Sequence, residues 1–243
     1  MPSPKKDKND KLLEPMEKSF ETSLLKCKLE TQTIRQFIYD TMGILPQVAT
    51  TEKYCTTLTE MRVVETCVLM SQTYYLSISG MYRNAYHNMR YILESAVQSV
   101  YIDAKHKNSS LRTKIEILKE VEDKRDYRIL NLISKLENLP HKDDLTAQYK
   151  RLSQMIHPSH RSVLDIMKCV PKSPDYFFID CNEISNIFEA LKITIDTVLF
   201  LFVRHTDDEI RAKIGKNIEF IQFCTKYNMF LVSKILKEKG NKK

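Results

Sequence analysis

The scarcity of residues that break helices constrains this chain most. Only four glycines and eight prolines occur among its 243 residues. Sheet proteins of this length need many more turn residues, because each short strand ends at a turn. The 42% hydrophobic content is enough to bury a core. We therefore predict an all-α protein, an antiparallel bundle of about six to eight helices.

Apolar spacing and breaker residues place these helices along the chain. We expect them over 12–42, from about 50 to 80, over 81–105, within 111–139, from about 143 to 156, over 183–205 and over 207–239. Residues 12–239 then form a single domain, with a corner at Gly80 and with Gly215 tolerated inside the C-terminal helix 207–239. The charged ends, the basic tail 1–11 and the tail 240–243, are predicted to be disordered.

Charge and cysteine content narrow the class of protein. A net charge of +7 is compatible with a polyanionic partner, although proteins dedicated to nucleic-acid binding carry a denser stripe of basic residues. The six cysteines include no CxxC pair and no apolar signal segment opens the chain, so we expect reduced thiols in a cytoplasmic protein. The most apolar run, 197–203, is far shorter than the roughly 20 residues of a bilayer span. We expect no membrane association.

Common catalytic signatures do not occur in the sequence. It contains no phosphate-cradling glycine loop, no HExxH motif and no nucleophile elbow. Asp207 and Asp208 are residue types that bind metals, but acidic residues at the start of a helix are typical of dipole stabilisation. We predict no metal site and no cofactor. The many methionines and tyrosines are compatible with a small-molecule pocket but are more typical of a core.

A polar stripe follows the predicted helix 81–105. Arg83, His87, Arg90 and Glu94 are spaced by four, three and four residues, so they share one side of the helix. One interpretation is a solvated face with an Arg90–Glu94 ion pair. The other makes the stripe one wall of a polar cleft between helices.

The segment YKRLSQMIHPSH, residues 149–160, holds the strongest candidate for chemistry. Arg151 and His157 lie about a turn and a half apart, and Pro158 makes His157 the end of its helix. Histidine can transfer a proton near neutral pH, and a guanidinium can bind a phosphate through two parallel hydrogen bonds. The pair would suit metal-free cleavage of RNA, in which the ribose 2′-hydroxyl attacks its own phosphate. The alternative is that His157 only fixes the turn by bonding to the backbone.

Two segments resemble known signatures. GMYRNAYHNMRYILES and YKRLSQMIHPS are similar to paired signatures of a helical prokaryotic family of unknown function, which in turn is similar to the HEPN superfamily of nucleotide-binding domains. The resemblance covers roughly residues 58–167, and it implies a HEPN-like core over roughly residues 50–205. It also implies a homodimer with a composite site across the dimer.

The resemblance implies a role for each matching residue. Arg151 would hold the phosphate and His157 would assist 2′-hydroxyl attack or leaving-group protonation, with Glu94 as a third catalytic residue. Further substrate contacts would come from four side chains, those of Arg83, His87, Arg90 and Ser153. Leu152 stands where active members usually place a polar residue, which favours a non-catalytic member.

Two functions from different classes follow. The first is a non-catalytic helical binding or scaffold module related to HEPN domains, which acts on a protein partner or on a nucleotide or RNA partner. The second is a metal-independent HEPN-type endoribonuclease of a toxin–antitoxin or defence system.

Overall fold

The computed structural model describes residues 10–49, 57–123, 128–136, 140–156, 179–205 and 208–238. Within these ranges the chain forms helices joined by turns, without a strand. The helices are α1 (Asp10–Lys26), α2 (Lys28–Ala49), α3 (Leu58–Ile78), α4 (Tyr82–Lys105), α5 (Leu111–Asp123), α6 (Ile129–Lys135), α7 (Lys142–Ile156), α9 (Cys181–His205), α10 (Asp208–Ile214), α11 (Ile218–Lys226) and α12 (Phe230–Glu238). The predicted all-α bundle is confirmed. The eleven described helices exceed the six to eight expected.

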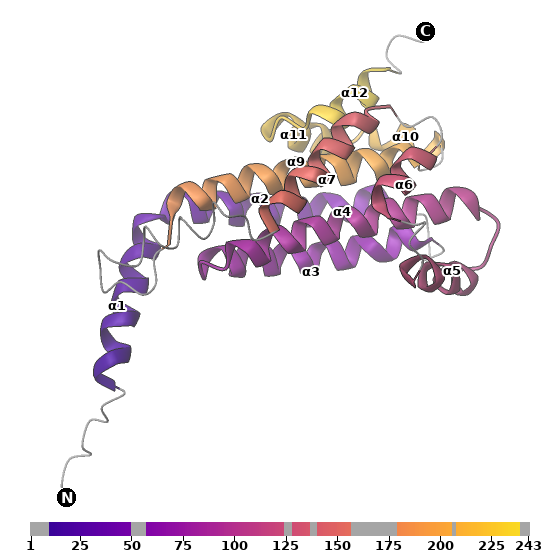
Figure 1. The fold of residues 1–243 in the computed structure, drawn as a ribbon. Coiled ribbons are helices and arrows are strands. Elements are labelled where there is room, and N and C mark those ends of the chain that lie inside the picture. Colours follow the sequence, from indigo (N-terminus) through magenta and orange to yellow (C-terminus); the bar gives the residue numbers. More distant parts are fainter. Residues whose placement is uncertain are drawn as a thin grey trace, which may run out of the picture.

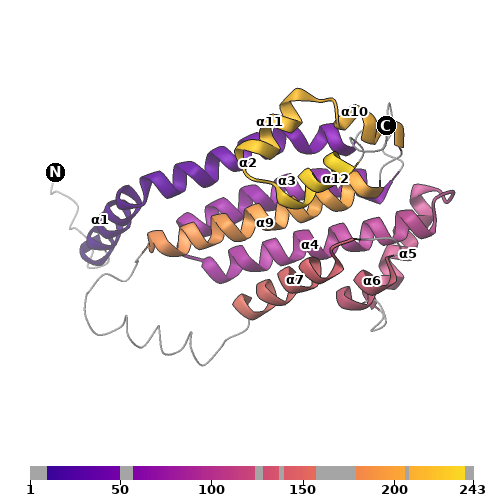
Figure 2. The same cartoon turned by 90° about the horizontal axis from the view of Figure 1, so that it is seen from above.

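Helix α9 is the centre of the bundle. Its residues from Thr194 to Val203 are all buried, and it packs against α2, α4 and α12. Seen from above, α9 runs over α3 and between α2 and α4 (Figure 2). A helix that is apolar all round must be surrounded by other helices. The apolar composition of the 183–205 segment therefore determines its central position.

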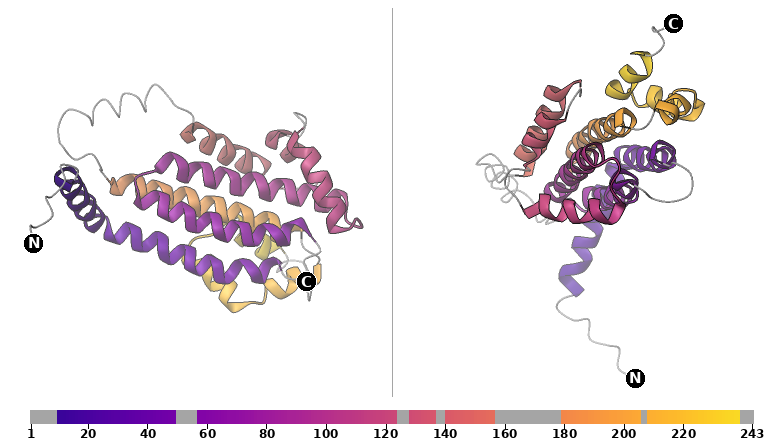
Figure 3. Two further views of the ribbon diagram at one scale, coloured as in Figure 1. Left: turned by 90° about the horizontal axis from the view of Figure 1, so that it is seen from below. Right: turned by 90° about the vertical axis from the view of Figure 1, so that its right-hand side faces the viewer.

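The helices form two layers around this centre. On one side α2, α3 and α4 lie next to one another (Figure 3, left). On the other side α7 and α12 pack over α4 and α9 (Figure 1). Helix α1 extends beyond the end of the bundle (Figure 1). The turn between α3 and α4 contains Gly80 with φ of 72°, a conformation that favours glycine. The predicted corner is confirmed there.

The N-terminal helices differ from the prediction in three ways. The single helix expected over 12–42 is divided at Cys27 into α1 and α2. Gly43 and Pro46, helix-breaking residues just beyond the expected end at residue 42, lie inside α2. Proline and glycine lower helix stability, but the last turns of α2 bury Leu45 and Val48 completely in the core, and this packing outweighs the local preference. In addition, α1 begins at Asp10, so the last two residues of the expected tail 1–11 are helical.

The C-terminal segment 207–239 is three helices where the sequence predicts one. Gly215 follows α10, and the Asn217 side chain caps α11 by accepting a hydrogen bond from the backbone N–H of Phe220 at 3.1 Å. Asn228, with φ of 52°, lies between α11 and α12. Asparagine tolerates this left-handed conformation better than most residues. The two bends allow α11 to pack on α2 and α12 to pack on α9.

A disulfide joins distant parts of the sequence. Cys27, at the break between α1 and α2, is bonded to Cys181 at the start of α9, 154 residues away. The expectation that all cysteines are reduced is therefore wrong for this pair. Cys67 and Cys224 are free, while Cys55 and Cys169 lie outside the described residues. A sequence without CxxC spacing could not reveal the pair, because folding alone brings the two residues together.

Among the described helices, none is long and apolar enough to serve as a transmembrane span.

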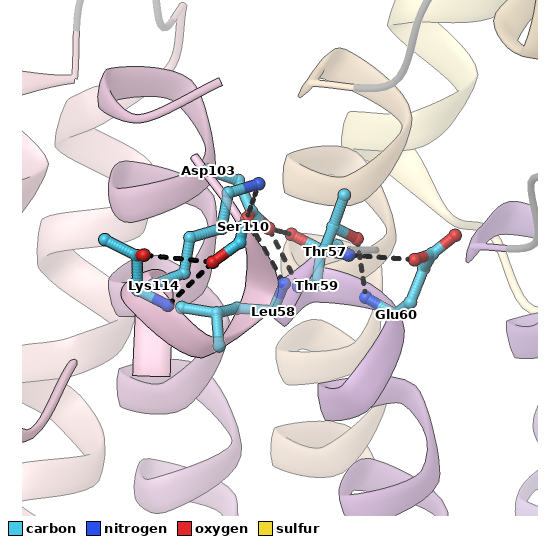
Figure 4. Close-up of polar contacts among 8 residues, drawn as sticks. Thr57, Leu58, Thr59, Glu60, Asp103, Ser110 and Lys114 are labelled. Carbon is cyan, nitrogen blue, oxygen red and sulfur yellow. Dashed lines mark hydrogen bonds and ion pairs between the residues drawn. The ribbon is translucent and has the colours of Figure 1, made fainter. Parts of the chain in front are cut away.

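A partly buried carboxylate joins α3, α4 and α5 (Figure 4). Asp103, near the end of α4, accepts hydrogen bonds from the backbone N–H groups of Leu58 and Thr59 at 3.2 and 2.9 Å. The Thr59 hydroxyl donates a third at 2.8 Å. Lys114 of α5, whose side chain is 3% exposed, lies 3.0 Å from the same carboxylate. One side chain therefore stabilises the N-terminus of α3 and neutralises a buried ammonium group.

Removal of this carboxylate should destabilise the protein strongly. We expect Asp103→Ala to lower the free energy of unfolding by about 3–5 kcal/mol, because Lys114 keeps a buried charge without its partner. Chemical denaturation followed by circular dichroism measures the change. The control is Arg112→Ala, which removes an exposed ion pair with Glu116 and should change stability by less than about 1 kcal/mol. Equal effects of the two variants would contradict the assigned role of Asp103.

Reduction of the disulfide should also destabilise the protein. A cross-link between positions 154 residues apart restricts the unfolded chain, so we expect reductant to lower the free energy of unfolding by about 2–4 kcal/mol. Urea titrations with and without reductant test this. Cys27→Ser should be insensitive to reductant, whereas Cys67→Ser should respond as the parent does. Identical titration curves for the parent under both conditions would show that the bond contributes nothing.

Candidate functional site

Arg90, Glu94 and Tyr149 form a closed polar cluster between α4 and α7. The Arg90 guanidinium lies 2.9 Å from Glu94 Oε1 and donates to the Tyr149 hydroxyl at 2.8 Å. That hydroxyl donates to Glu94 Oε1 at 3.0 Å. The guanidinium carbon also lies 5.1 Å from the centre of the Tyr149 ring, within the range of a cation–π interaction. Each of the three side chains therefore bonds to the other two.

The Tyr149 hydroxyl is a hydrogen-bond donor at neutral pH, and its surroundings extend this to higher pH. Desolvation raises the pKa of its hydroxyl, and the neighbouring Glu94 carboxylate raises it further. The hydroxyl therefore stays protonated at neutral pH and keeps its bond to Glu94. The Arg90–Glu94 ion pair exists, and it faces another helix instead of solvent alone.

The remaining members of the predicted α4 and α7 set lie outside this cluster. Arg83 and His87 are exposed, one to two turns before Arg90 on α4. The Ser153 hydroxyl donates to the backbone carbonyl of Tyr149 at 2.8 Å within α7, so it is already used in a local bond. Of the four predicted substrate contacts, Arg83 and His87 are therefore the most accessible.

Arg151 lies on the other flank of α7. It lines a pocket of about 370 Å³ between α7, α9 and α12, named here the α7–α12 groove. The groove is lined by Asp144, Ala147, Gln148 and Arg151 of α7, by Lys192, Ile193, Asp196 and Thr197 of α9, and by Asn228, Phe230 and Leu231 at the start of α12. Its volume falls in the range of small-molecule sites. Figure 3, right, shows α7 and α12 standing apart above α9.

Arg151 is the available cation of the groove. It is exposed, and it has no hydrogen bond or ion pair to any residue that the structure describes. Lys192, in contrast, lies 2.6 Å from the Glu189 carboxylate and over the Phe188 ring. Gln148 donates to the Ala190 carbonyl at 3.4 Å and so attaches α7 to α9.

Asp196 forms part of the groove floor and holds α12 in place. Its carboxylate accepts hydrogen bonds from the backbone N–H groups of Leu231 and Val232 at 2.9 and 3.1 Å. These are among the first N–H groups of α12, which lack partners inside their own helix. Desolvation raises the pKa of Asp196, and the hydrogen bonds from α12 offset only part of that effect. The carboxylate is thus a cap supplied by another helix.

The structure places two of the three residues expected to act together, Glu94 and Arg151, apart from each other. Glu94 bonds to Arg90 and Tyr149 on one flank of α7, whereas Arg151 lines the α7–α12 groove on the other. No hydrogen bond or ion pair of the described residues links Glu94 to Arg151. His157 lies outside the described residues, as do Pro158 and the residues up to 178.

Sequence reasoning missed two residues. Tyr149 begins the quoted segment, and its position eight residues before His157 carries no recognised signal. Phe230 lies in the segment 207–239, which is predicted to be one helix, and it is 60% exposed at the groove, where α12 begins after the bend at Asn228. In the segment 183–205, Lys192 and Asp196 lie four residues apart and therefore on one side of the helix. This spacing is the sequence pattern that could have indicated the groove floor.

A comparison of the chain with protein-family models, with curated proteins and with solved structures finds no match in any of the three. The local geometry is therefore the basis for any proposal about function.

The pH dependence of stability should report on Asp196. Because its native pKa is raised, its favourable contribution is present below the ordinary value of 3.8 and is lost as the pH rises through the native pKa. Asp196→Asn lacks this titration and keeps a side-chain oxygen for the cap. We expect its stability relative to the parent to increase as the pH rises through this window, measured by urea titrations at several pH values.

The matched variant Asp196→Leu removes the acceptor. It should cost about 2 kcal/mol at neutral pH, because the first N–H groups of α12 lose their partner. A stability difference between parent and Asp196→Asn that stays constant with pH would contradict the raised pKa. Equal stability of the Leu and Asn variants would contradict the capping role.

Proposed function

We propose that this chain is a non-catalytic helical binding module related to HEPN domains, and that the α7–α12 groove binds a nucleotide or an RNA segment. The observation that carries the proposal is Arg151, an exposed guanidinium without an ion pair among the described residues, at the edge of a groove of about 370 Å³. A guanidinium binds phosphate through parallel hydrogen bonds.

The other groove residues support an anionic, aromatic ligand. Phe230 exposes its ring at the groove, and an exposed aromatic ring can stack with any base. Lys234 places its ammonium 3.9 Å from the centre of the same ring, which adds positive charge beside the groove. Two acidic residues line the groove, Asp144 and Asp196. The Asp196 carboxylate receives hydrogen bonds from α12, and the Asp144 carboxylate lies 3.1 Å from His141 Nδ1. Both carboxylates therefore already have hydrogen-bond partners within the protein.

Binding measurements test the proposal. We expect fluorescence anisotropy with a labelled single-stranded RNA to detect binding by the parent, and Arg151→Ala to weaken it about 10- to 100-fold, since a charge-assisted contact is worth about 1.5–3 kcal/mol. Lys150→Ala is the control, because it removes the same charge from the next residue of α7, which does not line the groove. Equal loss in both variants would indicate attraction by net charge alone, and no binding by the parent would overturn the proposal.

The alternative remains a metal-independent endoribonuclease. It is supported by the same unpaired Arg151 and by the end of α7 at Ile156, directly before His157. It is weakened by Glu94, which is engaged with Arg90 and Tyr149. Incubation of the parent with labelled RNA in excess chelator separates the two functions. Cleavage that disappears in His157→Ala would favour the enzyme, and binding without cleavage would favour the module.

A further inference from the structure

Helix α3 exposes an apolar stripe on its outer face. Met61, Val64, Val68 and Tyr75 are 44%, 68%, 51% and 64% exposed, and their spacing of three, four and seven residues places them on one side of the helix. These four residues are named here the α3 stripe. The inner face of α3 is also buried against the core, with Val63 and Met70 among its buried residues. Apolar residues on both faces are typical of a helix that is covered on both sides.

The outer face of α3 also lacks free charge. From Thr66 to Ile78 the helix contains no charged residue, in a chain of which 28% is charged. The two charged residues nearest the stripe neutralise each other, since the Arg62 guanidinium lies 2.5 Å from the Glu65 carboxylate. The Tyr91 hydroxyl of α4 donates to the same carboxylate at 3.2 Å. Depletion of charge together with aromatic and methionine side chains is the composition of an interface core.

The position of α3 makes this face broad enough for a stable contact. Helix α3 lies between α2 and α4 in one layer, so the α3 stripe runs along the middle of a three-helix face (Figure 3, left). A contact about 30 Å long and about 20 Å wide covers on the order of 600 Å². This area is close to the roughly 800 Å² per partner of a standard interface. The flanking helices contribute to it through Tyr91, which is 39% exposed.

We propose that the α3 stripe is the interface of a homodimer, with a second copy of this chain as its occupant. The spacing of the stripe is self-complementary. Val68 lies midway between Met61 and Tyr75, seven residues from each. In an antiparallel pair related by a two-fold axis at Val68, Met61 lies opposite Tyr75 of the partner subunit, and Val68 lies opposite Val68 of the partner subunit. Methionine sulfur and an aromatic ring make a favourable contact.

The same register brings no like charges together. Glu65 lies opposite Ser71 of the partner subunit, and Val64 lies opposite Gln72 of the partner subunit, because each pair is equidistant from Val68. The paired Glu65 carboxylate therefore faces a hydroxyl and not another carboxylate. A shift of the axis by several residues would place one Glu65 near the other or leave Tyr75 without an apolar partner. Both the apolar contacts and the charges favour an axis at Val68.

This dimer does not bring two Arg151 side chains into one composite site, which is what the resemblance implies. Helix α4 lies between α3 and α7 (Figure 2), so pairing through α3 leaves the α7–α12 groove of each copy uncovered. The two Arg151 side chains then belong to two separate grooves. The inference does not depend on the proposed function, because the α3 stripe shares no residue with the groove.

Sedimentation velocity of the full chain over a concentration series tests the proposal. We expect the parent to sediment with twice the mass of one chain, and Val68→Glu to raise the dimer dissociation constant about 100-fold or more, because two carboxylates then meet at the axis. Val68→Lys should dissociate in the same way. An equimolar mixture of the Glu and Lys variants should form dimers again, since opposite charges meet across the axis. Circular dichroism checks that each variant keeps the helical content of the parent.

Each outcome decides the question. A monomeric parent at tens of micromolar, on the order of working concentrations for weak complexes, overturns the proposal. A parent dimer that persists in both Val68 variants shows that the chain associates through another face and also overturns it. Restored dimers in the mixture support it, because a misfolded variant cannot be rescued by a second one. Should Val68→Glu lose helical content, Tyr75→Asp at the end of the stripe replaces it, with the same expected loss of dimer.

Discussion

Burial of the second half of α9, from Thr194 to Val203, is the constraint on which the rest of this structure depends. These ten residues are buried on every side of the helix, so this half has no face to present to water. It must be covered by α2 and α4 along its length and by α7 and α12 above. The disulfide from Cys27 attaches its first residue to the break between α1 and α2. The helices packed around α9 shield its apolar side chains from water.

Two carboxylates lie where another helix needs a hydrogen-bond acceptor. Asp196 is buried in α9 and accepts hydrogen bonds from the first N–H groups of α12. Asp103 does the same for α3, with Lys114 as its counter-ion. In both cases a carboxylate from one helix supplies the acceptor that a second helix lacks at its N-terminus. These bonds specify where α3 and α12 begin relative to α4 and α9, which apolar packing alone does not.

The two flanks of α7 have different consequences for function. On one flank Tyr149 completes a closed cluster with Arg90 and Glu94, and these bonds hold α7 against α4. On the other flank Arg151 remains unpaired among the described residues, at a groove whose floor is formed by α9. The closed cluster favours a structural role, and the open groove favours binding. The proposed function assigns recognition to the second flank, with the first as its support.

The sequence by itself determined the fold class, the corner at Gly80, the central position of the segment 183–205 and the ion pair between Arg90 and Glu94. Each of these follows from the spacing of neighbouring residues or from local backbone preference. Only the tertiary structure decided the disulfide, the carboxylate caps, the bends around Asn217 and Asn228, and the separation of Arg151 from Glu94. The reason is physical. Each of these features depends on contacts between segments distant in sequence, and periodicity within one helix contains no information about which neighbour it meets. Packing also outweighed local preference at Pro46, where burial of the surrounding turns keeps α2 helical.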